Sequence, residues 1–236
     1  MPNLSVLPDF PRRVSLIGGL GVDPMVRLSL SARRLLAYLA LRAQPVARRV
    51  AAAQLWPDMP EDAGRTNLRR TLWQVPGGWV AAVGEELLLQ ACCDLPLAHA
   101  AAARALDGEP IGFSEIELLC GDVLPGWNEE WLMPAQDAFR LLRVQALEAA
   151  CRSLAAVGQL ALAVQAGTAA VAAEPFSESA AEALIHAHLA QGNRFHAMQC
   201  YRLLAERLDE ELGVAPDPAL QKRFNALNAC ARLRAS

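Results

Sequence analysis

Two residues recur at a fixed interval in the second half of this 236-residue chain. Gly158 returns as Gly192 and Ala163 returns as Ala197, each 34 residues later, and Pro175 lies between the copies. Glycine allows the turn between two helices, alanine allows the helices to approach closely, and proline ends the second helix. Each interval therefore predicts one helical hairpin. Such a hairpin cannot bury its apolar face unless neighbouring hairpins stack on it.

The period and residue types match a tetratricopeptide repeat, which we prefer to an arbitrary helical bundle. Hydrophobic periodicity predicts helices at 95–106, 115–120, 135–156, 160–173, 179–191, 194–212 and 218–233, and no convincing strand follows Leu95. The segment 153–173 carries no charge and is long enough to span a bilayer. Its glycines and glutamines favour a buried helix pair instead.

The first third of the chain has a different pattern. We predict strands at 14–17 and 26–30, helices at 33–42, 48–55 and 61–75 with Ser31 capping the first, and a hairpin of 79–83 with 87–89. Short strands, three helices and a closing hairpin make up a winged helix-turn-helix. In that architecture the third helix enters the major groove of DNA and the hairpin, or wing, lies beside the DNA backbone.

The third helix has two contrasting faces. At about 100° per residue, one arc holds the apolar residues Leu68, Leu72 and Val75. The opposite arc holds Thr66, Arg69, Arg70 and Trp73, and it is flanked by Arg65, Asn67 and Gln74. We therefore expect this helix to bury its apolar stripe and to present the second arc outward.

The outward arc supplies the predicted base contacts. Arg69 is the first choice, by bidentate contact with a guanine edge, and Arg70 and Thr66 come second. Trp73 packs on a sugar or a thymine methyl group, or alternatively on the wing hairpin. The predicted phosphate contacts are Arg48 and Arg49 at the start of the second helix, Arg65 in the first turn of the third, and Asn67.

Charge is distributed unevenly along the chain. Residues 1–80 carry eleven arginines against five carboxylates, whereas the remaining residues carry 11 basic and 20 acidic groups. This asymmetry indicates that a polyanion meets only the N-terminal part. The alternatives are chance clustering on solvated faces and a basic helix that only solubilises its domain.

Catalytic and metal-binding patterns have little support. The six cysteines include no Cys-x-x-Cys pair, and we expect them to be buried free thiols in a reducing cytosol. The four histidines are scattered, and no nucleophile–base spacing or phosphate-cradling loop occurs. We expect no enzyme activity, no catalytic residue, no cofactor and no metal. The first thirteen residues lack the apolar stretch of a signal peptide, which favours a cytoplasmic location.

Several motifs occur in a family-like order and spacing. They are Trp56-Pro57-Asp58, Arg65-Thr66-Asn67-Leu68-Arg69-Arg70, Gly121-Asp122-Val123-Leu124-Pro125-Gly126-Trp127 with Trp131, Glu174-Pro175-Phe176-Ser177-Glu178-Ser179, and Glu210-Glu211-Leu212-Gly213-Val214-Ala215-Pro216. From about Val14 to Leu227, the chain resembles the antibiotic regulatory proteins called SARP regulators. The resemblance implies an OmpR-type winged helix joined to a bacterial transcriptional activator domain built on tetratricopeptide-like helices.

The resemblance also implies partners. Members of this family bind direct repeats upstream of promoters, two copies side by side, and contact RNA polymerase. Without a Gly-x-x-x-x-Gly-Lys motif, the chain resembles the short form that lacks a nucleotide-hydrolysing domain. Three features depart from the family: Ala47 replaces a serine that could cap the second helix, Glu85-Glu86 replace arginine in the wing turn, and Pro76 ends the third helix early.

Together these patterns predict a mainly α fold with a small β component. A winged helix-turn-helix DNA-binding domain at 12–91 is followed by an all-α tetratricopeptide-like activator domain at 94–236. The predicted function is sequence-specific DNA binding with transcriptional activation, with double-stranded DNA and RNA polymerase as partners and a homodimer as the active form. The alternative is a tetratricopeptide-type interaction adaptor whose winged helix does not bind DNA. No membrane association is expected.

Overall fold

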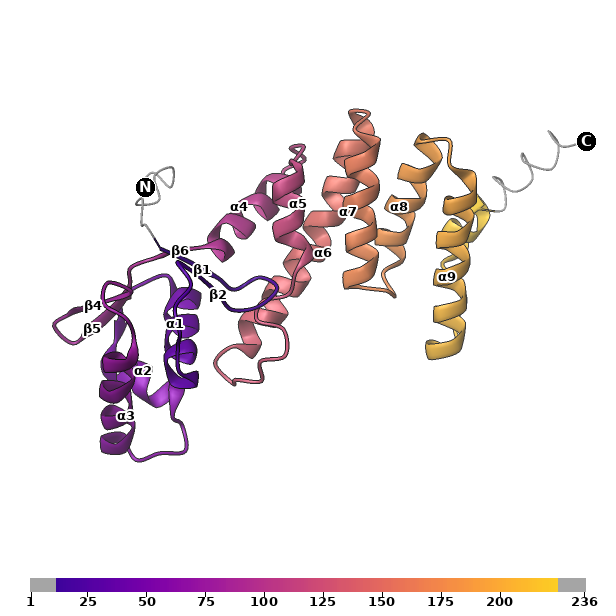
Figure 1. Cartoon of the computed structure of the whole chain (residues 1–236). Helices are drawn as coiled ribbons and strands as arrows, with labels where there is room; N and C mark the ends of the chain where they lie inside the picture. The colour runs from indigo at the N-terminus through magenta and orange to yellow at the C-terminus, as the bar shows by residue number, and fades with distance from the viewer. Residues whose placement is uncertain (1–11, 225–236) are drawn as a thin grey trace, which may run out of the picture. The chain divides into compact units, whose positions relative to one another are not determined.

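The computed structural model describes residues 12–224, so the predicted end of the last helix lies outside the described residues. The chain divides into two compact units. Within the described residues, the N-terminal unit comprises 12–98 and 121–139, and the C-terminal unit comprises 99–120 and 140–224. Each unit has its own core, and Figure 1 labels its elements.

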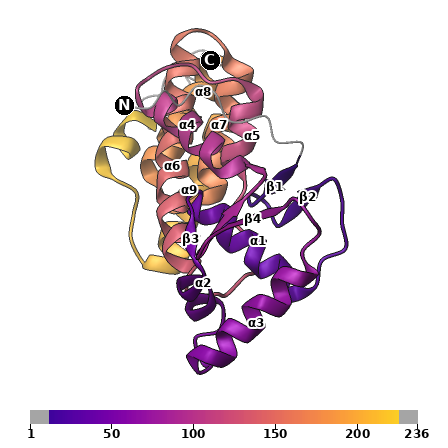
Figure 2. The same cartoon turned by 90° about the vertical axis from the view of Figure 1, so that its left-hand side faces the viewer.

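The N-terminal unit combines three helices with two small sheets (Figure 2). The helices are α1 (Leu30–Arg42), α2 (Arg48–Leu55) and α3 (Glu61–Gln74). One sheet has the order β2-β1-β6, from β1 (Arg13–Ser15), β2 (Gly21–Asp23) and β6 (Cys92–Cys93). The other has the order β3-β5-β4, from β3 (Val46–Ala47), β4 (Val80–Val83) and β5 (Glu86–Leu89). The predicted helix-turn-helix and wing hairpin are therefore confirmed.

The predicted strand at 26–30 is wrong. Its alternating apolar residues suit a strand, but Leu30 already begins α1. Ser29, rather than the predicted Ser31, caps this helix, because its hydroxyl oxygen accepts a hydrogen bond from the Ala32 amide at 3.3 Å. The partner of β1 is instead β2, which pairs antiparallel with Val14 opposite Val22. The short strands β3 and β6 were not predicted.

The segment 121–139 completes the core of the N-terminal unit. Val123 forms a β-bridge with Ile17. Trp131 is 7% exposed and packs edge-on against Tyr38 of α1, with ring centroids 5.2 Å apart. The Glu129 carboxylate accepts two hydrogen bonds from Arg34, at 2.6 and 2.7 Å. These contacts hold α1 against the segment 121–139.

The C-terminal unit is all helical in its described residues. Its helices are α4 (Asp94–Leu106), α5 (Phe113–Cys120), α6 (Met133–Ala156), α7 (Leu160–Ala173), α8 (Glu178–Ala190) and α9 (Arg194–Leu212), followed by a helix that begins at residue 218. The first residues of α4 and α6 belong to the N-terminal unit. Six of the seven helices predicted in this part of the chain agree with α4–α9 to within two residues at each end.

The repeat has the geometry that its residues predicted. Gly158 and Gly192 both have φ of 77°, a left-handed conformation that glycine adopts without steric cost, and each follows a helix end. Ala163 and Ala197 are buried where the helices of each hairpin approach. The segment 153–173 forms the end of α6, a turn and α7, as predicted. No helix within residues 12–224 is long and apolar enough to cross a bilayer.

Candidate DNA interface

Helix α3 is held by its apolar stripe. Leu68 and Thr71 are buried, and a Cβ added to Gly64 would lie 3.6 Å from the Ala52 carbonyl oxygen, so α3 packs closely on α2. At the other end of α3, the Ser29 hydroxyl donates to Gln74 Oε1 at 2.6 Å. The helix is thus fixed at both ends against α1 and α2.

The opposite face of α3 is open to solvent. Thr66, Arg69 and Arg70 are exposed. Neither arginine forms an ion pair with another residue that the structure describes. Trp73 is 85% exposed, so it does not pack on the wing hairpin. A hollow of about 420 Å³ lies between α3 and β4, with Arg69, Trp73 and Val80 among its lining residues. The four predicted base-contacting residues therefore share one accessible face.

Arginines from two helices meet at the wing turn. A second hollow, of about 480 Å³, is lined by Arg48 and Arg49 of α2, Arg65 and Arg69 of α3, and the turn residue Glu85. Glu61 also lines it, and its Oε1 lies 4.0 Å from Arg65 Nη1. Four arginines and two glutamates therefore line this hollow. The balance is positive, although the wing turn itself is acidic.

The predicted phosphate contacts are not equivalent in the structure. Arg49 and Arg65 are exposed, whereas Arg48 is half-buried. The Arg48 amide already donates to the Glu85 carbonyl oxygen at 2.8 Å, so this backbone group is not available to a phosphate. Asn67 is half-buried, and its amide donates to Met59 Sδ at 3.1 Å. Ala47, which stands where the family commonly has a serine, occupies the N-cap of α2 and supplies no side-chain hydrogen bond.

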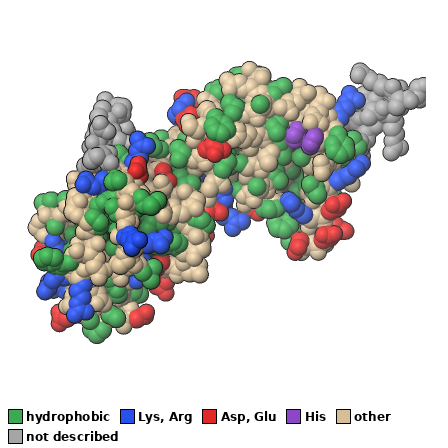
Figure 3. Space-filling view, in the orientation of Figure 1, with side chains coloured by type: hydrophobic (Ala, Val, Ile, Leu, Met, Phe, Trp, Pro, Cys, Tyr) green, Lys and Arg blue, Asp and Glu red, His purple; other side chains and the backbone are tan. Residues whose placement is uncertain are grey.

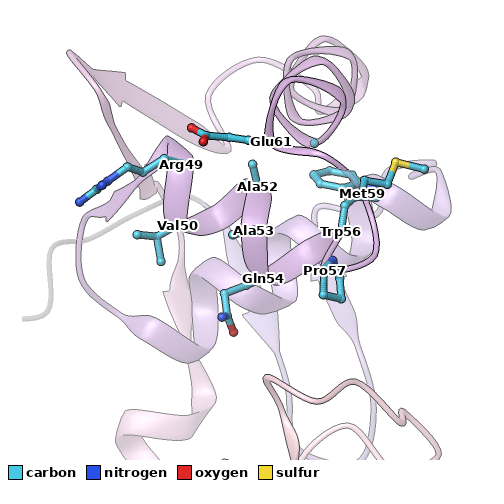
Figure 4. Close-up of a pocket in the computed structure, with 10 residues that line it drawn as sticks. Arg49, Val50, Ala52, Ala53, Gln54, Trp56, Pro57, Met59 and Glu61 are labelled. Carbon is cyan, nitrogen blue, oxygen red and sulfur yellow. The ribbon is translucent and has the colours of Figure 1, made fainter.

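A third hollow, of about 490 Å³, lies beside the loop that joins α2 to α3. Figure 4 shows Trp56, Pro57 and Met59 together at one end of it, while Arg49 points away at the other. Glu61 is the single carboxylate among its lining residues. The residues that line this hollow therefore offer no pair of groups for acid–base catalysis.

Two sets of contacts were not predicted from the sequence: those of α1 with Glu129 and Trp131, and the stacking of His188 on His196. The family motif that includes Trp131 lies within the activator domain predicted at 94–236, whereas the structure places it in the N-terminal unit. The partners of Glu129 and Trp131 on α1 lie more than 90 residues earlier, where no local periodicity could indicate the contact. His188 and His196 stack with ring centroids 5.4 Å apart, although the histidines looked scattered along the chain.

Two of the described cysteines are unreactive at neutral pH. Burial raises the pKa of the Cys93 thiol to about 12 and that of Cys151 to about 11, so both stay protonated at neutral pH. The expected burial is met in full only by Cys151 among the described cysteines: Cys92, Cys93 and Cys200 are partly buried, and Cys120 is exposed. Among residues 12–224, no cluster of three or more histidine, cysteine, aspartate or glutamate side chains is placed to hold a metal ion.

A winged helix-turn-helix followed by stacked helical hairpins defines a class of transcription regulators. The family model described as the bacterial transcriptional activator domain matches residues 98–228, which is more than half of the chain. The chain belongs to this family, in agreement with its resemblance to the SARP regulators. Regulators of this type are non-enzymatic transcription factors.

The fold is also similar to that of a solved structure, EmbR of Mycobacterium tuberculosis in complex with a low-affinity phosphopeptide. The TM-score is 0.61 at 23% sequence identity, over 92% of this chain and 65% of EmbR. The chain thus spans about two thirds of the length of the structure that it matches. No curated protein matches the sequence.

Proposed function

We propose that this activator binds specific DNA sequences by inserting α3 into the major groove. The observation that carries the proposal is the accessible face of α3, where Arg69 and Arg70 are exposed beside Thr66 and Trp73. A bidentate arginine–guanine contact is the commonest specific contact in the major groove. Arg69 reads a base in this arrangement, supported by Arg70 and Thr66, and Trp73 contacts a sugar or a thymine methyl group.

The phosphate contacts come from the rim of the arginine hollow. Arg49 and Arg65 are exposed there, and Arg48 contributes through its side chain, since its amide is already bonded. Asn67 can reach a phosphate only if its amide leaves Met59 Sδ. Glu85 and Glu86 repel phosphate, so the wing adds less to affinity than α3 does.

The wider assignment follows the family. The domain at 12–91 binds DNA and the domain at 94–236 activates transcription. Two copies of the chain occupy direct repeats near a promoter and contact RNA polymerase in the cytoplasm. The competing function is an interaction adaptor whose winged helix does not bind DNA, and the exposed wing glutamates and the net charge of −3 favour it.

Selection of sites from random double-stranded DNA, followed by anisotropy titrations at increasing salt, tests the proposal. A DNA-binding protein loses affinity steeply as salt rises, because binding releases counterions from phosphates. Arg69→Ala should weaken the selected site by about 1–3 kcal/mol and relax the preference at one base pair. Arg48→Ala should weaken all sequences alike and reduce the salt slope by about one.

Arg202→Ala is the matched control, because it removes one exposed arginine from α9 in the C-terminal unit. It should leave affinity, specificity and salt slope unchanged. Failure to recover any sequence motif, together with binding that does not respond to salt, would contradict the proposal and favour the adaptor.

A further inference from the structure

The C-terminal unit contains a hollow that the DNA-binding proposal does not use. It lies among α7, α8 and α9 and has a volume of about 300 Å³. Val171, Leu184, Leu203 and Leu204 form apolar walls, and His188, His196 and Arg207 are among the polar groups that line it. Figure 3 shows histidine side chains beside hydrophobic ones on the visible face of this unit. Known small-molecule sites have this combination of apolar walls and a few polar groups, with volumes from roughly 300 Å³ upward.

His188 forms part of one wall of the hollow and is itself only 8% exposed. Its ring stacks on that of His196, with centroids 5.4 Å apart. Burial, together with the neighbouring His196, lowers the pKa of His188, so its ring is neutral at pH 7. The uncharged His188 ring therefore extends the wall of the hollow without adding a charge to it.

The charge of the lining residues limits what can bind. Arg207 is exposed, is among the residues that line the hollow, and forms no ion pair with another described residue. His196 is held in place by Asn193, with 2.8 Å between its Nδ1 and Asn193 Oδ1. No aspartate or glutamate lines the hollow. An anionic group is therefore attracted, and a cation meets no counter-charge among these residues.

We propose that this hollow binds a small apolar carboxylic acid. The hydrocarbon part lies among Val171, Leu184 and Leu204. The carboxylate pairs with Arg207, which lines the hollow and is exposed. Such a ligand contacts three consecutive helices of the repeat, so its binding stabilises their stacking. The site lies within the C-terminal unit alone, and the proposal does not depend on DNA binding.

Calorimetry on the intact chain tests the site with 3-phenylpropionate as the probe. Its amide, 3-phenylpropanamide, keeps the hydrocarbon and lacks the charge, whereas acetate keeps the charge and lacks the hydrocarbon. We expect the acid to bind about tenfold more tightly than the amide, as one charge-assisted contact allows, and acetate not to bind. Binding of the acid should also shift the ring ¹⁵N signals of His188 and His196.

Three variants locate the binding. Arg207→Gln should weaken the acid about tenfold and leave the amide unchanged. Leu203→Trp fills the hollow from a residue that is already 44% exposed, so it should fold normally and abolish binding of both compounds. Arg202→Gln, on the same helix but outside the hollow, should bind as the unmodified chain does.

Several results would overturn the proposal. One is that the acid does not bind while the circular dichroism spectrum shows a folded chain. Another is that acid and amide bind equally well. A third is that affinity for the acid is unchanged in both Arg207→Gln and Leu203→Trp. Each of these results can be obtained whether or not the winged helix binds DNA, so the two proposals fail separately.

Discussion

The ion pair between Arg34 and Glu129 predicts a measurable coupling between α1 and the segment 121–139. The two carboxylate oxygens lie 2.6 Å from Arg34 Nε and 2.7 Å from Arg34 Nη2. Glu129 also accepts a hydrogen bond from Trp131 Nε1 at 3.1 Å. The side chains of Arg34 and Glu129 are 21% and 24% exposed, so water screens them only in part.

The expected coupling free energy between Arg34 and Glu129 lies between two known limits. Exposed ion pairs contribute about 0–1 kcal/mol, and breaking a fully buried pair costs about 3–5 kcal/mol. For a bidentate pair that is about three-quarters buried, we expect a coupling free energy of about 2 kcal/mol. A double-mutant cycle of Arg34→Met and Glu129→Gln isolates this quantity.

Native-state hydrogen exchange on the intact chain is the appropriate assay, because a chain with two units need not unfold in one step. If the amides of α1 exchange through local opening, a loss of 2 kcal/mol speeds their exchange by about 30-fold. The control cycle uses Arg65 and Glu61, an exposed pair at 4.0 Å in the same unit. It should give a coupling below about 0.5 kcal/mol. A coupling equally small at Arg34 and Glu129 would refute the reasoning.

Three further predictions concern other parts of the chain. Gly121→Ala should destabilise the N-terminal unit by about 1–3 kcal/mol in chemical denaturation, because the added Cβ would lie 2.6 Å from Ile17 Cγ2. Gly77→Ala, where nothing lies within 4 Å, should cost less than about 0.5 kcal/mol. Glu85→Gln removes a negative charge from the wing turn and should tighten DNA binding about two- to fivefold at low salt. His188→Gln should flatten the pH dependence of unfolding: the pKa of His188 is lowered in the folded chain, so the unfolded state binds a proton first and stability falls as pH drops below 6.5.

Each of these predictions has a result that contradicts it. Equal stability of the two glycine variants would show that the contact with Ile17 is relaxed at no cost. If Glu85→Gln left affinity unchanged at every salt concentration, the wing would lie far from the phosphates. An unaltered pH profile in His188→Gln would mean that the ring is not desolvated.

The helices of the repeat and the faces of α3 could be predicted because both depend on short-range periodicity. Leu68 is buried and Arg69 exposed in the structure, as the rotation of 100° per residue requires. The strand predicted at 26–30 failed because its alternation is also compatible with an extended lead into α1, where the Ser29 cap decides the helix start.

The contacts that could not be predicted join residues far apart in the sequence. Arg34 and Glu129 are 95 residues apart, and each is an ordinary surface residue type. His188 and His196 are different, because they lie four residues on either side of Gly192 and the predicted hairpin could have indicated their contact. The roles assigned to Arg69 and its neighbours on DNA stay predictions.

Membership of residues 121–139 in the N-terminal unit has a practical consequence for building chimeric regulators. A junction placed near residue 92 would replace the winged helix by that of a relative. Glu129 and Trp131 would then lose Arg34 and Tyr38, their partners in this chain. A graft that transfers both stretches together keeps the native pairings intact. Such a graft should transfer the DNA sequence preference without destabilising the N-terminal unit.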